Sequence, residues 1–141
     1  MYELVYCSSA KPDLGSEDIA AILKTARDFN SKNNITGCLL YYKHEFIQIL
    51  EGEREIIKDL FSRINMDSRH KDITVLAEGS KEKRVFDDWS MAFYEPGQED
   101  IKDIGRDVFA DNLLTFSEFA EKGTFPTILF WGKVSLLLQK Q

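Results

Sequence analysis

Residues 35–52 read ITGCLLYYKHEFIQILEG, and this stretch decides the fold. Two apolar runs, 35–42 and 46–50, flank the short polar segment 43–45, and this pattern predicts a β-hairpin. Amphipathic segments lie before and after it in the chain. The hairpin is therefore expected to stand between two helices.

The flanking segments extend this pattern in both directions. Residues 2–8 form a strand candidate, and Ser16 is expected to cap a helix that ends near residues 33–34. Strands are also expected at 73–78 and 89–94. The expected buried faces of the two helices are Ile19, Ile22, Leu23 and Ala26 on the first, and Ile56, Ile57, Leu60, Phe61 and Ile64 on the second. The order predicts an α+β, ferredoxin-like βαββαββ fold: a mixed five-stranded sheet with two helices on one face.

The C-terminal part looks helical. Pro96-Gly97 marks a boundary, so we expect a domain over 1–95 and a helical extension over 96–141. Helices are expected at 101–109 and 127–138. They could cover the open face of the sheet or form an oligomer contact, and the sequence does not separate these alternatives.

The composition is that of an ordinary soluble domain, with 43% hydrophobic residues and a net charge of −6. The basic cluster Lys81-Glu82-Lys83-Arg84 is interpreted as a solvated loop, so neither nucleic acid nor a membrane is expected as a partner. The most apolar segment, 128–138, is too short to span a bilayer. Cys7 and Cys38 lack metal-ligand spacing to either histidine, so no metal site is expected. With no secretory signal, a cytoplasmic location is predicted.

Three polar residues interrupt apolar faces. Tyr6 shares a strand face with Tyr2 and Leu4, Gln48 lies in a row with Phe46 and Leu50, and Asn30 falls on the buried stripe of the first helix. An unpaired buried amide costs about 1–3 kcal/mol, so each needs a partner. They could bond to one another or to backbone. Alternatively, their donors and acceptors could bind the edge of a planar ring such as an isoalloxazine, with Tyr6 donating to Gln48.

Further residues could complete such a site. Ile22, Leu23 and Ala26 would form its apolar walls. Arg63 and Asp67 are four residues apart, with Arg69 and His70 just after them. They could form a surface ion pair or the mouth for a ribityl and phosphate tail.

The order and spacing of several separated motifs resemble the BLUF domain, the family of sensors of blue light using FAD. The resemblance covers residues 2 to about 95, and the two C-terminal helices resemble those of the short, single-domain members. The motifs are Leu4-Val5-Tyr6-Cys7-Ser8, Asn30, Ile35-Thr36-Gly37-Cys38-Leu39-Leu40-Tyr41, Phe46-Ile47-Gln48-Ile49-Leu50-Glu51-Gly52, Asp67-Ser68-Arg69-His70 and Trp89-Ser90-Met91.

This resemblance implies a photoreceptor that is not an enzyme, with FAD as cofactor and FMN or riboflavin as alternatives. Tyr6 and Gln48 would be photoactive, and Trp89 and Met91 would relay the signal. Flavin-binding positions would be Ile22, Asn30, Gln48, Arg63, Asp67 and His70. Light would drive an electron and a proton from Tyr6 through Gln48, leaving Gln48 rotated or tautomerised and more strongly bonded to the flavin C4 carbonyl.

Two positions depart from the family pattern. Phe29 and Ala26 stand where relatives often carry polar side chains, which puts extra polar contacts to the flavin in doubt. Output is expected to pass through the C-terminal helices to a downstream regulatory protein of unknown identity or to a second copy, because no cyclase or phosphodiesterase sequence follows residue 141.

Two other functions fit the same fold. One is a flavin-free interaction module, which the joint presence of Tyr6, Asn30 and Gln48 argues against. The other is an acylphosphatase-like hydrolase, whose loop of backbone amides would need an arginine. Here loop 8–16 offers only Lys11 and carries Asp13.

Overall fold

The computed structural model describes residues 1–86, 90–94 and 124–139. The elements are β1 (Tyr2–Ala10), α1 (Ser16–Lys32), β2 (Thr36–Tyr42), β3 (Glu45–Gly52), α2 (Arg54–Asn65), β4 (His70–Ser80), β5 (Ala92–Tyr94) and α5 (Phe125–Gln139). This order confirms the predicted α+β, βαββαββ arrangement. Trp89 and the helix expected at 101–109 lie outside the described residues.

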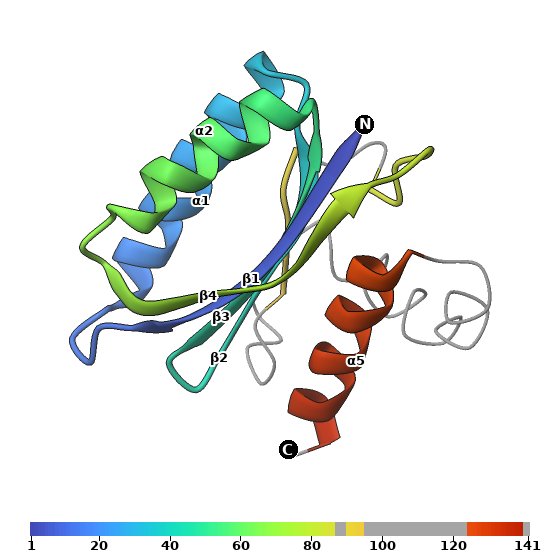
Figure 1. Cartoon of the computed structure of the whole chain (residues 1–141). Coiled ribbons are helices and arrows are strands. Elements are labelled where there is room, and N and C mark those ends of the chain that lie inside the picture. Colours follow the sequence, from blue (N-terminus) through green and yellow to red (C-terminus); the bar gives the residue numbers. More distant parts are fainter. Residues whose placement is uncertain (87–89, 95–123, 140–141) are drawn as a thin grey trace.

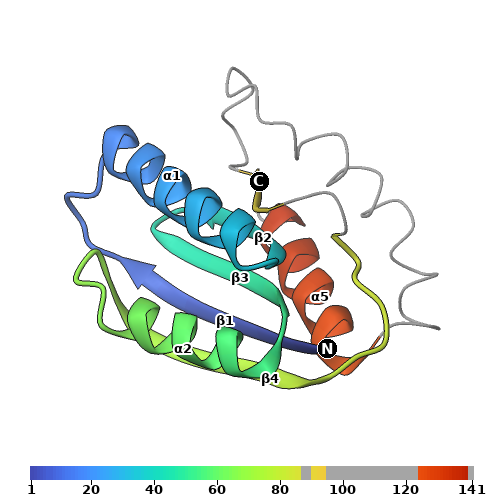
Figure 2. The ribbon, with the colours of Figure 1, turned by 90° about the horizontal axis from the view of Figure 1, so that it is seen from above.

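The sheet has the strand order β4-β1-β3-β2-β5. The first four strands pair antiparallel, whereas β5 pairs with β2 in parallel, so the sheet is mixed. Helices α1 and α2 lie on one face and α5 lies on the other (Figure 1). The view from above shows α1 and α2 over the same face of the sheet, with α1 over one side and α2 over the other (Figure 2).

The hairpin of β2 and β3 depends on two local features. Its two-residue turn places Lys43 at φ 47° and His44 at φ 65°, the left-handed conformations that match the twist of the two strands. In β2, a Cβ added to Gly37 would lie 2.1 Å from the Ile49 carbonyl oxygen of β3. Only glycine allows the strands to approach so closely at this point.

The register of β1 against β3 determines which residues meet on each face. Tyr6 is paired with Gln48, and Glu3 is paired with Glu51. Because side chains alternate along a strand, the first pair faces α1 and α2 and the second faces α5. All residues of β3 except Glu45 are buried, so both of its faces lie in a core.

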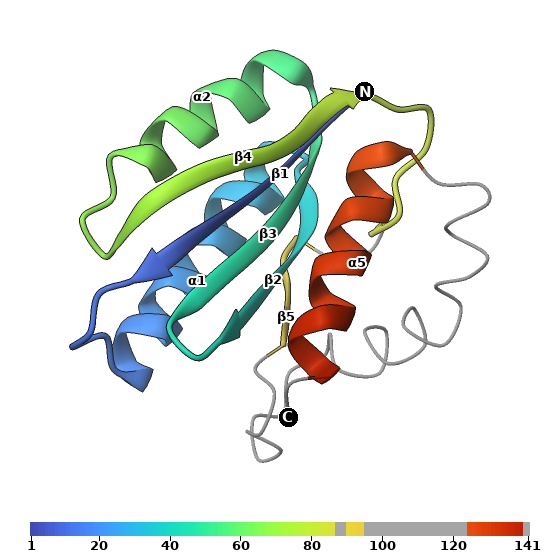
Figure 3. The same cartoon turned by 60° about the horizontal axis from the view of Figure 1, so that its bottom comes forward.

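Helix α5 covers the sheet face opposite α1 and α2 (Figure 3). It buries Phe130, Trp131 and Val134 in a cluster with Phe86 and with residues of β1, β2 and β3. The sequence left open whether this helix covers the sheet or forms an oligomer contact. In the structure its buried side covers the sheet. None of the helices in the described residues is both long and apolar enough to cross a membrane.

The interpretation of Lys81–Arg84 as a solvated loop holds for Glu82 and Lys83, which are exposed, and is wrong for Lys81 and Arg84. Lys81 is 8% exposed, and its ammonium forms ion pairs with Glu3 and Glu51, both of which are fully buried. Thr127 of α5 donates a hydrogen bond to Glu3 Oε1 over 2.8 Å. Arg84 donates to the carbonyl oxygens of Asn34 and Glu51. The run of charged residues suggested exposure to solvent. In the structure the segment returns to the sheet and supplies the cations that the buried carboxylates of the sheet require.

The start of α1 also differs from the prediction. The N-cap is Gly15 rather than Ser16, and no side chain caps the helix. Instead, the Asp18 carboxylate accepts a 2.9 Å hydrogen bond from the Gly15 backbone N–H. The predicted end near residues 33–34 is confirmed by a C-cap at Asn33.

The Lys81 cluster makes a prediction about stability. Lys81→Met should lower the free energy of unfolding by about 3–5 kcal/mol, because two buried carboxylates would lose their shared cation. Lys83→Met is the matched control, since Lys83 is exposed two residues away. Urea unfolding followed by far-UV circular dichroism measures both. Equal stabilities of the two variants would mean that the buried ion pairs do not hold this face together.

Candidate functional site

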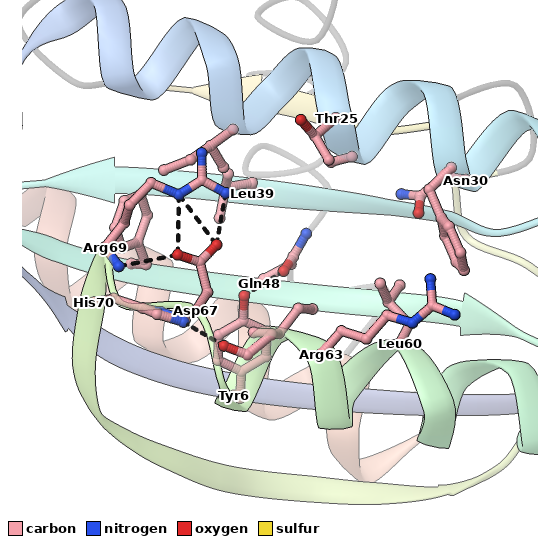
Figure 4. A pocket seen from close by; sticks show the side chains of 15 residues that line it. Tyr6, Thr25, Asn30, Leu39, Gln48, Leu60, Arg63, Asp67, Arg69 and His70 are labelled. Atoms are coloured by element: carbon pink, nitrogen blue, oxygen red, sulfur yellow. Dashed lines mark hydrogen bonds and ion pairs between the residues drawn. The ribbon is translucent and has the colours of Figure 1, made fainter.

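A pocket opens between α1, α2 and the sheet (Figure 4). The cavity has a volume of about 190 Å³. Its walls are mainly apolar and carry a few polar groups. The lining residues are Tyr6, Ile22, Thr25, Ala26, Phe29, Asn30, Leu39, Phe46, Gln48, Leu60, Arg63, Ile64, Asp67, Arg69 and His70.

Tyr6 and Gln48 form a hydrogen-bonded pair on the sheet at the base of the pocket. The Tyr6 hydroxyl donates to Gln48 Oε1, and both residues are buried. They are directly opposite in the β1–β3 ladder, so their side chains leave the sheet as neighbours. Burial raises the pKa of the Tyr6 phenol well above its usual range, and the Asp67 carboxylate adds to this effect. Tyr6 is therefore a neutral donor at ordinary pH.

Met91 lies on the other side of the Gln48 amide. Gln48 Nε2 donates to Met91 Sδ over 3.2 Å, and Met91 is 2% exposed. The sequence left open whether Trp89 or Met91 approaches this site. In the structure Met91 contacts Gln48, and Trp89 lies outside the described residues.

Asn30 projects from the last turns of α1 to the edge of the cavity (Figure 4). Its Nδ2 donates to the Ser90 carbonyl oxygen over 2.7 Å. Its Oδ1 is buried and accepts no hydrogen bond within the described part of the chain. A buried amide oxygen at a pocket wall is an acceptor ready for a ligand N–H, because leaving it unpaired is costly.

The end of the pocket beyond α2 carries charged groups. Arg69 forms an ion pair with Asp67 at 2.6 Å, and these bonds hold the pKa of the Asp67 carboxyl below its usual value. His70 contacts the Ser8 hydroxyl at 2.8 Å and the Ile64 carbonyl oxygen at 2.7 Å through its two ring nitrogens. Its ring is therefore fixed from both sides.

The surface ion pair, one of the two alternatives that the sequence left open for Arg63 and Asp67, does not form between these residues. Helix α2 ends at Asn65, so Asp67 has left the helical spacing. Arg63 instead pairs with Asp59 at 3.4 Å, and its guanidinium lies 5.2 Å from the centre of the Phe29 ring. Both Arg63 and Asp67 nevertheless line the pocket.

The structure brings most of the predicted site residues to one cavity. They are Tyr6, Ile22, Asn30, Gln48, Arg63, Asp67 and His70. Leu23, an expected wall residue, is buried in the core and does not line the pocket. Arg69 was missing from the expected flavin-binding positions, although its place between Asp67 and His70 was a usable signal. Leu39 was missed because it reads as an ordinary strand residue, and only its pairing opposite Gln48 brings it to the site.

The raised pKa of Tyr6 predicts how stability depends on pH. Above about pH 10 the unfolded chain releases the phenolic proton while the folded protein retains it, so the free energy of unfolding falls as pH rises. Tyr6→Phe removes this contribution, up to about 1.4 kcal/mol per pH unit. Urea unfolding at pH 9, 10 and 11 should show a shallower decline for Tyr6→Phe than for the parent or for Tyr42→Phe. Parallel declines would show that Tyr6 titrates normally.

Comparison with known proteins agrees with this geometry. The family model "BLUF: Sensors of blue-light using FAD" matches residues 1–92. The photoactivated adenylate cyclase subunit beta of Euglena gracilis is 35% identical over 89 residues, which cover 62% of this chain and 10% of that protein. The chain thus spans about a tenth of the length of the curated relatives it matches.

Two solved structures extend the match to three dimensions. The BlsA ground state is 32% identical with a TM-score of 0.66, covering 88% of this chain and 74% of that one. The dark-state structure of BlrB, a BLUF protein, is 29% identical with a TM-score of 0.66, covering 78% of this chain and 96% of that one. The family match covers about two thirds of the chain, and the Tyr6–Gln48 pair beneath the pocket agrees with it. The chain therefore belongs to the BLUF family of blue-light sensors that use FAD.

Proposed function

We propose that the hydrogen bond between Tyr6 and Gln48 is the light-driven switch of this photoreceptor. The observation that carries the proposal is the position of Gln48. The oxygen and the nitrogen of its side-chain amide are held by different partners. Its Oε1 accepts from Tyr6 and its Nε2 donates to Met91 Sδ. A change in the amide therefore alters both contacts at once, one at the photoactive residue and one at the strand beyond it.

The pocket fits a flavin. Ile22 and Leu39 offer apolar surface for a ring system. Asn30 Oδ1, which has no partner among the residues that the structure describes, suits a ring N–H. Arg63 and Arg69 offer positive charge for a phosphate-bearing tail. A bound flavin would supply the absorption of blue light and an excited state that accepts an electron.

The residues of the chain would then move the charge. Tyr6 gives up an electron, and its phenolic proton leaves along the existing hydrogen bond to Gln48 Oε1. When both return to Tyr6, the Gln48 amide is left rotated or tautomerised. Gln48 would then present a different group to the pocket and to Met91. The absorption of the bound flavin would shift slightly to the red.

The signal would leave the pocket through Met91 and strand β5. Trp89 remains a proposed relay residue, and the helical extension over 96–141 remains the proposed output surface. Because the relative from Euglena gracilis is an adenylate cyclase subunit, we propose that output here acts on an effector, either a downstream regulatory protein or a second copy of the chain. A cytoplasmic location and the division at residue 95 stay predictions.

The first experiment is an absorption spectrum of the purified protein before and after blue illumination. We expect a flavin spectrum that shifts slightly to the red and recovers in darkness. Extraction and chromatography of the bound flavin distinguish FAD from FMN and riboflavin. A protein that stays colourless after incubation with FAD would contradict the proposal and favour a flavin-free interaction module.

Tyr6→Phe should retain flavin and lose the red-shifted state, because the electron and proton donor is removed while the ring volume is kept. Tyr42→Phe, which changes a partly exposed tyrosine at the hairpin end, should behave as the parent. Difference spectra under identical illumination measure both. A red shift of normal size in Tyr6→Phe would mean that another residue is the donor.

Asn30→Ala should weaken flavin binding by about tenfold, the loss expected for one good hydrogen bond. Asn65→Ala is the control, because Asn65 is exposed at the end of α2 and does not line the pocket. Equilibrium titration of the flavin-free protein with FAD gives both dissociation constants. Equal constants would assign Asn30 a structural role only.

A further inference from the structure

Two side chains of α1 hold the backbone just before β5. Asn30 Nδ2 donates to the Ser90 carbonyl oxygen over 2.7 Å, and Arg27 Nε donates to the Met91 carbonyl oxygen over 3.0 Å. Arg27 and Asn30 are three residues apart and therefore lie on one side of the helix. Two consecutive carbonyl groups are thus fixed by one helix, an arrangement we call the α1 clamp.

The backbone of the segment that the clamp holds has only a short sheet pairing within the described residues, although the side chains of Met91 and Phe93 are buried in the core. Strand β5 contains three residues and pairs only with β2, at the edge of the sheet. A short parallel pairing is weaker than the antiparallel pairing of the other strands. A charged donor such as Arg27 therefore contributes substantially to the position of this backbone.

The position of the backbone decides where the Met91 sulfur lies. Met91 is unbranched, and its side chain adapts to many shapes, so packing alone does not fix Sδ. Holding the Met91 carbonyl places the side chain against Gln48, where Sδ accepts from Nε2 over 3.2 Å. Arg27 is therefore linked to the Gln48 amide through Met91.

We propose that Arg27 is a positioning residue of the photoswitch: by clamping the Met91 carbonyl, it favours the Gln48 orientation in which Oε1 meets Tyr6 and Nε2 meets Met91. The proposal rests on the proposed function and assigns this orientation to the dark state. Arg27 is the informative member of the clamp because it does not line the pocket, whereas Asn30 does. Its substitution separates positioning of the switch from binding of the flavin.

The test compares Arg27→Met, which keeps the length of the side chain but removes its donors, with Arg27→Lys, which retains an N–H donor. Lys24→Met is the control, because Lys24 is exposed one turn earlier on α1. Flavin affinity should stay within about twofold in all three. Dark recovery should slow about fivefold in Arg27→Met. Loss of a charge-assisted hydrogen bond should disfavour the dark arrangement about tenfold, and part of this loss should raise the barrier to recovery. Arg27→Lys should be intermediate, and Lys24→Met should match the parent.

A double-mutant cycle asks whether Arg27 acts through Met91. Met91→Leu keeps the volume and removes the sulfur acceptor, so it should also slow recovery. If Arg27 works through this contact, adding Arg27→Met to Met91→Leu should change the recovery rate by less than about twofold. Independent effects that multiply in the double variant would overturn the proposal, as would unchanged or faster recovery in Arg27→Met.

Hydrogen exchange tests the clamp without light or flavin. In the flavin-free protein, the backbone amides of β5 should exchange at least about fivefold faster in Arg27→Met than in the parent or in Lys24→Met, because the strand loses an anchor. Unchanged exchange would overturn the clamp itself. If the parent shows no photocycle while exchange responds as expected, the proposed switch fails and the clamp stands, so the two failures are distinguishable.

Discussion

The structure depends on the antiparallel register between β1 and β3. That register pairs Tyr6 with Gln48 on one face of the sheet and Glu3 with Glu51 on the other. A slip of one residue would turn every side chain of one strand to the opposite face. The Tyr6 phenol would then lose the Gln48 amide, and a buried carboxylate would turn to the face covered by α1 and α2. One backbone ladder therefore builds both the sensing site and the polar cluster that anchors α5.

The two faces use buried polar groups in different ways. The Glu51 carboxylate accepts from Lys81, from Thr36 and from the backbone N–H groups of residues 85 and 86, so its position is fixed. On the other face Gln48 and Asn30 carry amides, each with a donor and an acceptor that could change partners. The many hydrogen bonds to Glu51 make one side rigid, while neutral amides leave the other side able to switch. The rigid side also gives β3 a fixed support beneath the pocket.

Much of the fold and part of the site followed from local patterns. Alternation and helical periodicity gave the element order, and the presence of Tyr6, Asn30 and Gln48 on apolar faces pointed to the pocket. The errors share one cause. Lys81 was assigned to solvent because charge is usually solvated. The four-residue spacing of Arg63 and Asp67 suggested an ion pair that does not form, because the helix ends at Asn65. In both cases the outcome depended on groups distant in sequence, or on where the chain leaves a helix, and periodicity reports neither.

The sequence by itself determined which residues belong to strands and helices, which faces they bury, and which polar side chains need partners, because these properties depend on spacing within one element. Only the tertiary structure decided that Lys81 neutralises Glu3 and Glu51, that Met91 rather than solvent meets the Gln48 amide, and that Arg27 holds the Met91 carbonyl. These contacts join segments at least 30 residues apart in the chain. Their geometry is set by how the strands, helices and connecting segments pack together, which no single element encodes.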